Sequence, residues 1–88
     1  MASILVTGAS RGIGRATCLS LARAGHRVFA TMRDPSKAVE LSAIAGAESL
    51  PLIVSAMDVD SDDSVRLGVG DIAAQHGPVD VLVNNAGI

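Results

Sequence analysis

The sequence predicts an α/β fold built on a parallel, doubly wound sheet. Short apolar segments rich in β-branched residues alternate with segments whose apolar residues recur at helical spacing. A glycine-rich turn separates the first two segments, and no repeat or low-complexity tract interrupts the alternation. Parallel strands require right-handed crossovers, so this order places helices on both faces of the sheet. We therefore assign residues 1–88 to one domain.

The first strand and helix flank the glycine-rich turn. Residues 3–7 are short, apolar and β-branched and end at Gly8, which predicts a buried strand. A helix then reaches Ala24, with Gly25 placed to end it. Its apolar character comes from Ile13, Ala16, Thr17, Leu19, Leu21 and Ala22. Cys18 falls among these positions, where a free cysteine packs as a small hydrophobe.

A second strand and helix follow. Residues 27–32 form the strand, and Asp34-Pro35 supplies an N-cap followed by a proline suited to the first helical position. The helix is expected from Pro35 to about Ile44, with Gly46 closing it. Residues 50–57 then predict a third strand, and Asp58 stands at its exit.

The last helix and strand complete the order. Ser61 is suited to cap a helix that runs to about His76, with Asp62 and Asp63 complementing the dipole of its first turn. Glycines inside this helix weaken it, since each costs roughly 1 kcal/mol relative to alanine. Residues 79–83 form a fourth strand, which runs into Asn84-Asn85-Ala86-Gly87.

Composition excludes several classes of function. Seven Lys and Arg face nine Asp and Glu, for a net charge of −2, so no basic stripe is available for nucleic acid or an anionic membrane. No apolar run approaches the ~20 residues of a membrane helix and no signal peptide is evident, so a cytoplasmic location is expected. One cysteine and two isolated histidines offer no metal-ligand spacing.

The turn at residues 7–14 carries the main functional signal. It lies between the first strand and its helix, where a dinucleotide pyrophosphate meets a helix N-terminus in Rossmann-type folds. Gly8 permits a tight turn, Gly12 lets the backbone approach phosphate, and Gly14 permits close packing of helix on sheet. Ser10 adds a hydroxyl for a phosphate or ribose oxygen. The alternative is an ordinary strand-to-helix loop.

Three motifs together resemble the N-terminal half of the short-chain dehydrogenase/reductase family: Thr-Gly-Ala-Ser-Arg-Gly-Ile-Gly at 7–14, Asp58-Val59, and Asn-Asn-Ala-Gly at 84–87. The resemblance implies hydride transfer between a nicotinamide cofactor and a carbonyl or alcohol substrate. It also implies that Asp58 and Val59 meet the adenine and that Asn85 contacts the cofactor, while Asn84 supports the sheet. The expected cofactor contacts are Gly8, Ser10, Arg11, Gly12, Ile13, Gly14, Arg33, Asp58, Val59, Asn85, Ala86 and Gly87.

The end of the second strand favours NADP over NAD. Rossmann sites that prefer NAD commonly place an acidic side chain there to bond the adenosine ribose, but this sequence has Met32. Arg33 follows at once, and Arg11 lies in the turn, so two guanidinium groups are available to a 2′-phosphate. The alternative interpretation is a solvated Arg33 paired with Asp34.

No catalytic residue is assigned in this chain. The family's general acid or base is a tyrosine assisted by Lys, Ser and Asn, all of which follow the Asn-Asn-Ala-Gly motif, and this sequence contains no Tyr. We therefore expect a cofactor-binding half-domain truncated before its catalytic segment and inactive alone. The alternative is a non-catalytic dinucleotide-binding module, or a fragment that assembles with another chain. Val81 and Val83 near an unpaired edge strand predict a need for the missing half, a second chain or self-association.

Overall fold

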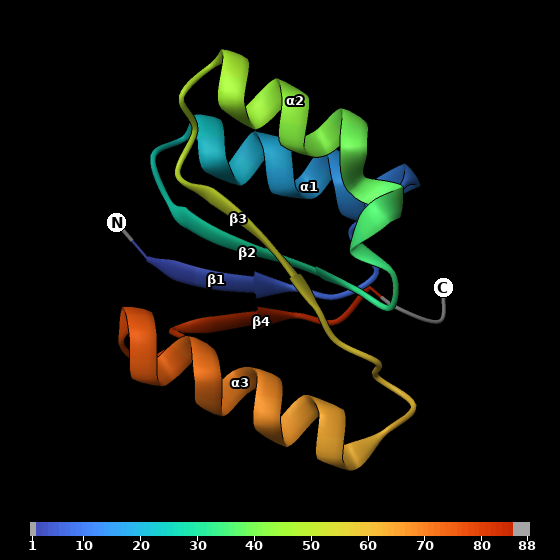
Figure 1. Cartoon of the computed structure of the whole chain (residues 1–88). Coiled ribbons are helices and arrows are strands. Elements are labelled where there is room, and N and C mark those ends of the chain that lie inside the picture. The colour runs from blue at the N-terminus through green and yellow to red at the C-terminus, as the bar shows by residue number, and fades with distance from the viewer. Residues whose placement is uncertain (1, 86–88) are drawn as a thin grey trace.

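The computed structural model describes residues 2–85 and confirms the predicted α/β fold. Four parallel strands form one sheet in the order β3-β2-β1-β4. Helices α1 and α2 cover one face and α3 covers the other (Figure 1). The elements are β1 (Ser3–Val6), α1 (Gly12–Arg23), β2 (Arg27–Met32), the 3₁₀ helix η1 (Pro35–Ala38), α2 (Val39–Ala47), β3 (Leu52–Ala56), α3 (Asp62–His76) and β4 (Val81–Val83).

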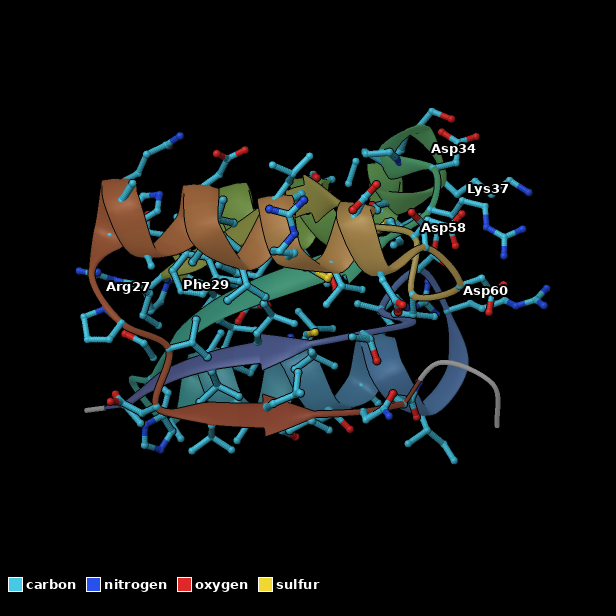
Figure 2. The ribbon with its side chains drawn as sticks, turned by 90° about the horizontal axis from the view of Figure 1, so that it is seen from below. Arg27, Phe29, Asp34, Lys37, Asp58 and Asp60 are labelled. Carbon is cyan, nitrogen blue, oxygen red and sulfur yellow. The ribbon has the colours of Figure 1, made fainter. Side chains whose placement is uncertain are left out.

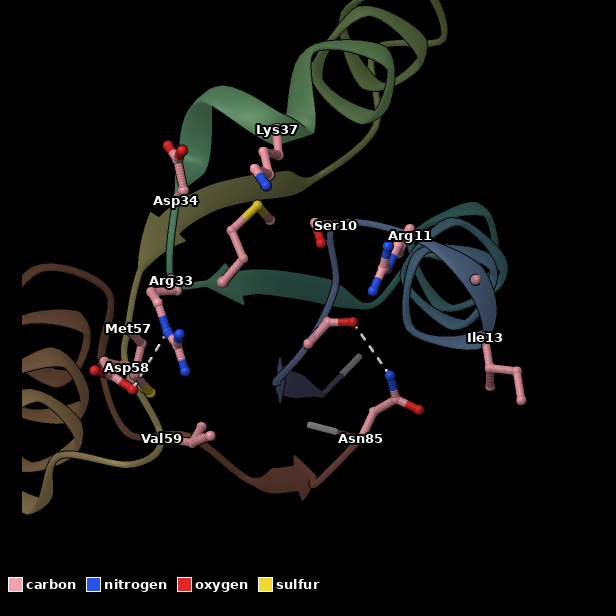
Figure 3. A pocket seen from close by; sticks show the side chains of 13 residues that line it. Ser10, Arg11, Ile13, Arg33, Asp34, Lys37, Met57, Asp58, Val59 and Asn85 are labelled. Atoms are coloured by element: carbon pink, nitrogen blue, oxygen red, sulfur yellow. Dashed lines mark hydrogen bonds and ion pairs between the residues drawn. The ribbon is translucent and has the colours of Figure 1, made fainter. Parts of the chain in front are cut away.

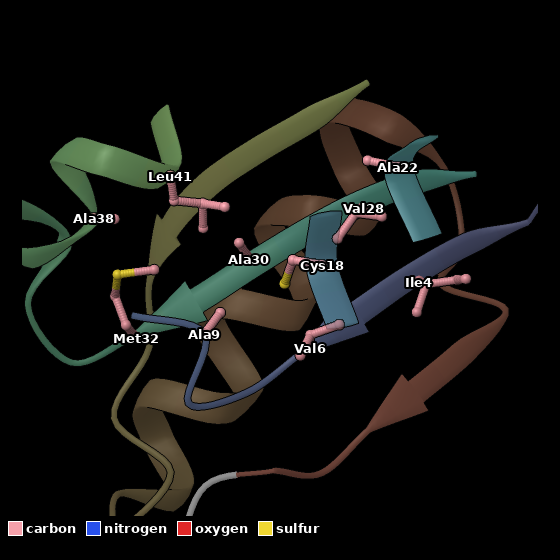
Figure 4. Close-up of a cluster of buried hydrophobic side chains, with 10 residues drawn as sticks. All are labelled: Ile4, Val6, Ala9, Cys18, Ala22, Val28, Ala30, Met32, Ala38 and Leu41. Atoms are coloured by element: carbon pink, nitrogen blue, oxygen red, sulfur yellow. The ribbon is translucent and has the colours of Figure 1, made fainter. Parts of the chain in front are cut away.

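Alternation along the strands divides the core into two clusters. The larger cluster lies between the sheet and helices α1 and α2 (Figure 4), and comprises Ile4, Val6, Ala9, Cys18, Ala22, Val28, Ala30, Met32, Ala38 and Leu41. Within it Cys18 is fully buried, and this burial raises the pKa of its thiol to about 12. The prediction that Cys18 is a packing residue is thus confirmed. The smaller cluster comprises Leu5, Phe29, Met57 and Ile72, beneath α3.

Helix α1 buries one narrow face. Its buried residues are Gly14, Cys18 and Ala22, which recur every four positions and so form one stripe against the sheet. Ile13, one of the apolar residues expected in this helix, lies outside that stripe and is 70% exposed. The predicted end is confirmed, because the helix stops at Arg23 and Gly25 adopts a φ of +95°.

The second helix differs from the prediction at both ends. Asp34 caps it as expected, accepting a hydrogen bond of 3.0 Å from the backbone N–H of Ser36, but the first turn is the 3₁₀ helix η1 rather than α-helix. Gly46 does not close α2, which continues to Ala47. The residue with a left-handed backbone after the helix is Ser49, with a φ of +53°. Serine rarely adopts this conformation, so the sequence does not predict it.

Helix α3 follows the prediction closely. Ser61 caps it, with its hydroxyl accepting a 3.2 Å hydrogen bond from the N–H of Ser64, and the helix ends at His76 before Gly77, whose φ is +89°. Its two internal glycines are in different surroundings. A Cβ at Gly68 would lie 2.7 Å from the Cε atom of Met57, whereas a Cβ at Gly70 would meet no atom within 4 Å.

This difference predicts unequal effects of two alanine substitutions. Gly70→Ala is expected to raise the free energy of unfolding by about 1 kcal/mol, because alanine loses less conformational entropy in a helix. Gly68→Ala should gain less, since the Met57 side chain must move. Urea denaturation of both variants checks the difference. Equal stabilisation would mean that Met57 places no constraint on α3.

Strand β4 lies at an edge of the described sheet and is paired only with β1 there. Its Val81 and Leu82 side chains are 45% and 62% exposed, whereas Val83 is partly buried against the larger cluster. The predicted apolar edge is therefore present, with Leu82 as its most exposed member. Among the helices of residues 2–85, none is both long enough and apolar enough to cross a membrane.

Candidate functional site

A cleft of ≈ 650 Å³ lies at the carboxyl edge of the sheet, where the loops after all four strands meet. Ligands of open α/β sheets bind at this edge because the loops there are free to form a crevice. Figure 3 shows the side chains around it. The lining residues are Gly8, Ser10, Arg11, Gly12, Ile13, Met32, Arg33, Asp34, Lys37, Met57, Asp58, Val59 and Asn85.

The structure brings most of the predicted contact residues together in this cleft. Gly14 is an exception, because it is buried behind the glycine-rich turn and does not line the cleft. Ile13 contributes to the lining, but its side chain extends away from the other labelled side chains (Figure 3). The predictions for Ala86 and Gly87 lie outside the described residues. The predicted residues that line the cleft are Gly8, Ser10, Arg11, Gly12, Ile13, Arg33, Asp58, Val59 and Asn85.

The glycine-rich turn presents an uncapped helix N-terminus to the cleft. Gly8 and Gly12 have φ of +63° and +61°, a conformation that side-chain-bearing residues rarely adopt. A Cβ at Gly12 would meet no atom within 4 Å, so this part of the turn is open. Arg11 is the N-cap residue of α1 and makes no side-chain cap, whereas η1 and α3 are both capped. The first-turn N–H groups and dipole of α1 are therefore available to an anion.

Gly14 holds α1 close to the turn. A Cβ on this residue would overlap the carbonyl oxygen of Gly8 and lie 2.6 Å from Nδ2 of Asn85. Only a residue without a side chain fits there. The predicted role in close packing thus agrees with the geometry of the described residues.

A hydrogen-bond network joins the turn to the end of β4. The backbone N–H of Asn85 donates to Oγ1 of Thr7 at 3.0 Å, and its side-chain Nδ2 donates to the carbonyl oxygen of Gly8 at 3.2 Å. The N–H of Thr7 donates in turn to the carbonyl of Val83 at 3.0 Å. Asn85 therefore fixes the turn as well as lining the cleft. Thr7 was not among the predicted site residues. The signal that could have identified it was a polar residue at the end of the predicted strand, residues 3–7.

The opposite wall of the cleft carries Asp58 and Val59. Oδ1 of Asp58 accepts a 3.0 Å hydrogen bond from the backbone N–H of Asp60 and lies 3.7 Å from Nε of Arg33. Val59 adds a partly exposed apolar side chain. A carboxylate beside an apolar surface suits a flat heterocycle with an amino group, because the carboxylate accepts the N–H bond while the apolar surface covers the ring.

Three cationic side chains line the cleft: Arg11, Arg33 and Lys37. Sequence reasoning missed Lys37, although it is the sole lysine and lies in the turn that Asp34 caps. Arg11 and Lys37 form no hydrogen bond or ion pair with any side chain of residues 2–85. They remain available to an anionic ligand.

Arg33 does not pair with Asp34, the partner given to it in the alternative interpretation of the sequence. Its Nη2 donates to Oδ2 of Asp60 at 2.9 Å, and it also faces Asp58. Asp34 instead accepts from the hydroxyl and N–H of Ser36, at 2.7 and 3.0 Å, and these bonds lower the pKa of its carboxyl. The interpretation that Arg33 pairs with Asp34 is therefore wrong, because Asp34 caps η1 through Oδ1 and the guanidinium of Arg33 lies against Asp58 and Asp60.

The residues present fit a phosphorylated dinucleotide. An open glycine turn, an uncapped helix N-terminus and two unpaired cations face the same cleft. No group of three His, Cys, Asp or Glu side chains within the described part of the chain is arranged to hold a metal ion. A parallel doubly wound sheet with this turn defines the class of Rossmann-type dinucleotide-binding proteins.

Comparison with known proteins identifies the family. The model of the short chain dehydrogenase family matches residues 2–88, and this chain belongs to that family. It is 45% identical over 91 residues to 3-oxoacyl-(acyl-carrier-protein) reductase of Staphylococcus epidermidis, covering 98% of this chain and 36% of the relative. The chain thus spans about a third of the length of the relatives it matches.

Two solved structures with cofactors are also similar. One is a gluconate 5-dehydrogenase from Burkholderia cenocepacia in complex with NADP and tartrate, 34% identical with a TM-score of 0.86. The other is a variant actinorhodin polyketide ketoreductase with NADPH, 33% identical with a TM-score of 0.89. Each match covers 99% of this chain, and 34% and 33% of the respective structures.

Proposed function

We propose that the whole protein is an NADP-dependent oxidoreductase that transfers hydride between the nicotinamide and a carbonyl or alcohol substrate. The described cleft is then its cofactor site. The observation that carries this proposal is the cluster of Arg11, Arg33 and Lys37 around the cleft, with Met32 instead of a carboxylate at the end of β2. The two similar structures with NADP and NADPH support the same cofactor.

Each part of the cleft has a distinct task in this proposal. The N-terminus of α1 binds the pyrophosphate through its N–H groups, with the hydroxyl of Ser10 beside them. Asp58 accepts from the adenine amino group, and Val59 covers the ring. The bound cofactor supplies the hydride in its reduced form. These residues orient and retain the cofactor. We assign no residue to the proton transfer that accompanies hydride transfer.

The cationic cluster accounts for the preference for NADP. A 2′-phosphate gains charge-assisted hydrogen bonds from guanidinium and ammonium groups, and these are about twice as strong as neutral ones. Met32 makes no charged contact with the ribose and adds no repulsion. NAD lacks the phosphate, so the same cations add little to its binding.

The preference is testable by titrating NADPH and NADH into the protein and into Arg33→Ala. We expect the unmodified protein to bind NADPH more tightly, and the substitution to weaken NADPH binding about tenfold with little change for NADH. Arg66→Ala is the matched control, because Arg66 is an exposed arginine of α3 that pairs with Asp63 outside the cleft. Equal affinity of the unmodified protein for both nucleotides would contradict the proposal.

The exposed edge of β4 indicates how the whole protein is completed. Val81 and Leu82 are apolar and exposed, and an unpaired strand edge is a template for another strand. We propose that further residues of the protein, or a second chain, pair with the backbone of β4 and pack against these side chains, which alternate between the two faces of the sheet.

A further inference from the structure

We propose that Asp60 is a specificity-determining residue of the cofactor site, because its carboxylate competes with the 2′-phosphate for the guanidinium of Arg33. The inference rests on the proposed function of the cleft as an NADP site. It adds a residue outside the cleft to those that set the choice between NADP and NAD. Asp60 acts by holding a cation that the phosphate needs.

The contact geometry identifies Asp60 as the main partner of Arg33. Nη2 of Arg33 lies 2.9 Å from Oδ2 of Asp60, within hydrogen-bond distance, whereas Nε lies 3.7 Å from Oδ1 of Asp58. The same Oδ1 of Asp58 also accepts a hydrogen bond from the backbone N–H of Asp60. Figure 2 shows Asp58 and Asp60 at the same end of the molecule as Lys37. One guanidinium is thus shared by two carboxylates at the rim of the site.

The other two cations are not held in this way. Arg11 and Lys37 have no ion pair with the side chains of residues 2–85, although Lys37 attracts the carboxylate of Asp34 at longer range, so an incoming phosphate meets both cations without breaking a direct contact. Arg33 instead must exchange the carboxylate of Asp60 for the phosphate. This exchange weakens binding of NADP and leaves binding of NAD unaffected, because NAD has no 2′-phosphate.

The expected change in NADPH affinity is small because the ion pair between Arg33 and Asp60 is exposed to solvent. The side chains of Arg33 and Asp60 are 72% and 78% exposed, and exposed ion pairs are weak because water screens them. Removing the competing charge is therefore expected to tighten NADPH binding about two- to fivefold. The gain should shrink at high salt, which screens exposed charges.

Four variants test the inference by titration with NADPH and NADH: Asp60→Asn, Asp63→Asn, Arg33→Ala and the double variant. Asp60→Asn should bind NADPH about two- to fivefold more tightly than the unmodified protein, with unchanged affinity for NADH. Asp63→Asn is the matched control, because it removes the same charge from an exposed carboxylate that pairs with Arg66. The double variant Arg33→Ala with Asp60→Asn should show no such gain over Arg33→Ala alone, since the competition has gone.

The outcomes separate this inference from the function on which it rests. If Arg33→Ala weakens NADPH binding but Asp60→Asn leaves it unchanged, the role of Asp60 is refuted and the NADP site stands. An equal gain in the presence and absence of Arg33 also refutes it, since the effect is then general repulsion. If Arg33→Ala changes the affinity for neither nucleotide, Arg33 does not bind the 2′-phosphate and the role of Asp60 fails with it. The preference for NADP itself fails only if the unmodified protein binds both nucleotides equally.

Discussion

Replacing Gly14 with alanine is expected to lower the free energy of unfolding by about 1–3 kcal/mol, the usual range for overpacking a close contact. The added Cβ overlaps the backbone carbonyl of Gly8, which cannot rotate away as a flexible side chain would, and crowds Nδ2 of Asn85. The turn must then shift away from β4. NADPH binding should weaken at least tenfold, because the N–H groups of the turn lose their alignment. Urea denaturation and nucleotide titration measure the two effects.

Gly12→Asn is the matched control for this prediction. Gly12 adopts a left-handed conformation but has open space around a Cβ, and asparagine tolerates that conformation better than most residues. We expect this variant to stay within about 1 kcal/mol of the unmodified protein in stability while it loses affinity for NADPH. If Gly14→Ala is as stable as Gly12→Asn, the close approach of α1 to the turn is not a constraint.

Phe29→Ala is expected to cost about 3–5 kcal/mol of stability, the largest loss that we predict. Phe29 is fully buried in the smaller core cluster, and its ring lies 5.2 Å from that of His76 at an angle of 50°. Small domains are stable by only about 5–15 kcal/mol, so much of the protein should unfold at low denaturant concentration. Thermal and urea denaturation followed by circular dichroism check this loss.

Phe29→Leu provides the control, since it keeps an apolar side chain of similar reach and should cost less than about 1.5 kcal/mol. A loss below 1 kcal/mol for Phe29→Ala would show that α3 adds little to the core. Leu5 and Ile53 are in register with Phe29 on neighbouring strands, so the cavity would open between a buried and a partly exposed neighbour.

The order of elements could be predicted because its signals are local. Asp34 and Ser61 cap their helices as their positions indicate, and Gly25 and Gly77 end helices with positive φ. Such features depend on a few neighbouring residues, so they can be predicted from a single sequence. The carboxyl edge of the sheet could also be predicted, since parallel strands bring their ends together.

The features that could not be predicted depend on distant residues. The exposure of Ile13 is one, because apolar content does not tell which residues of the helix meet the sheet. Arg33 pairs with Asp60, 27 residues away, rather than with its neighbour Asp34. Lys37 reaches the cleft only because η1 places it there. None of these outcomes follows from periodicity, because each depends on how separate loops approach one another.

The bond between Asn85 and Gly8 has a consequence for the order in which the chain is made. The glycine-rich turn leaves the ribosome early and is joined to β2 by the N–H of Ala9, which donates to the carbonyl of Thr31 at 3.1 Å, but the residue that joins Gly8 to the end of β4 is synthesised 77 positions later. Domains fold during synthesis as their contacts become available, and contacts of long sequence separation form last. The nascent chain therefore carries an unfinished turn until β4 has emerged. The turn reaches its complete set of bonds only after that strand has joined β1.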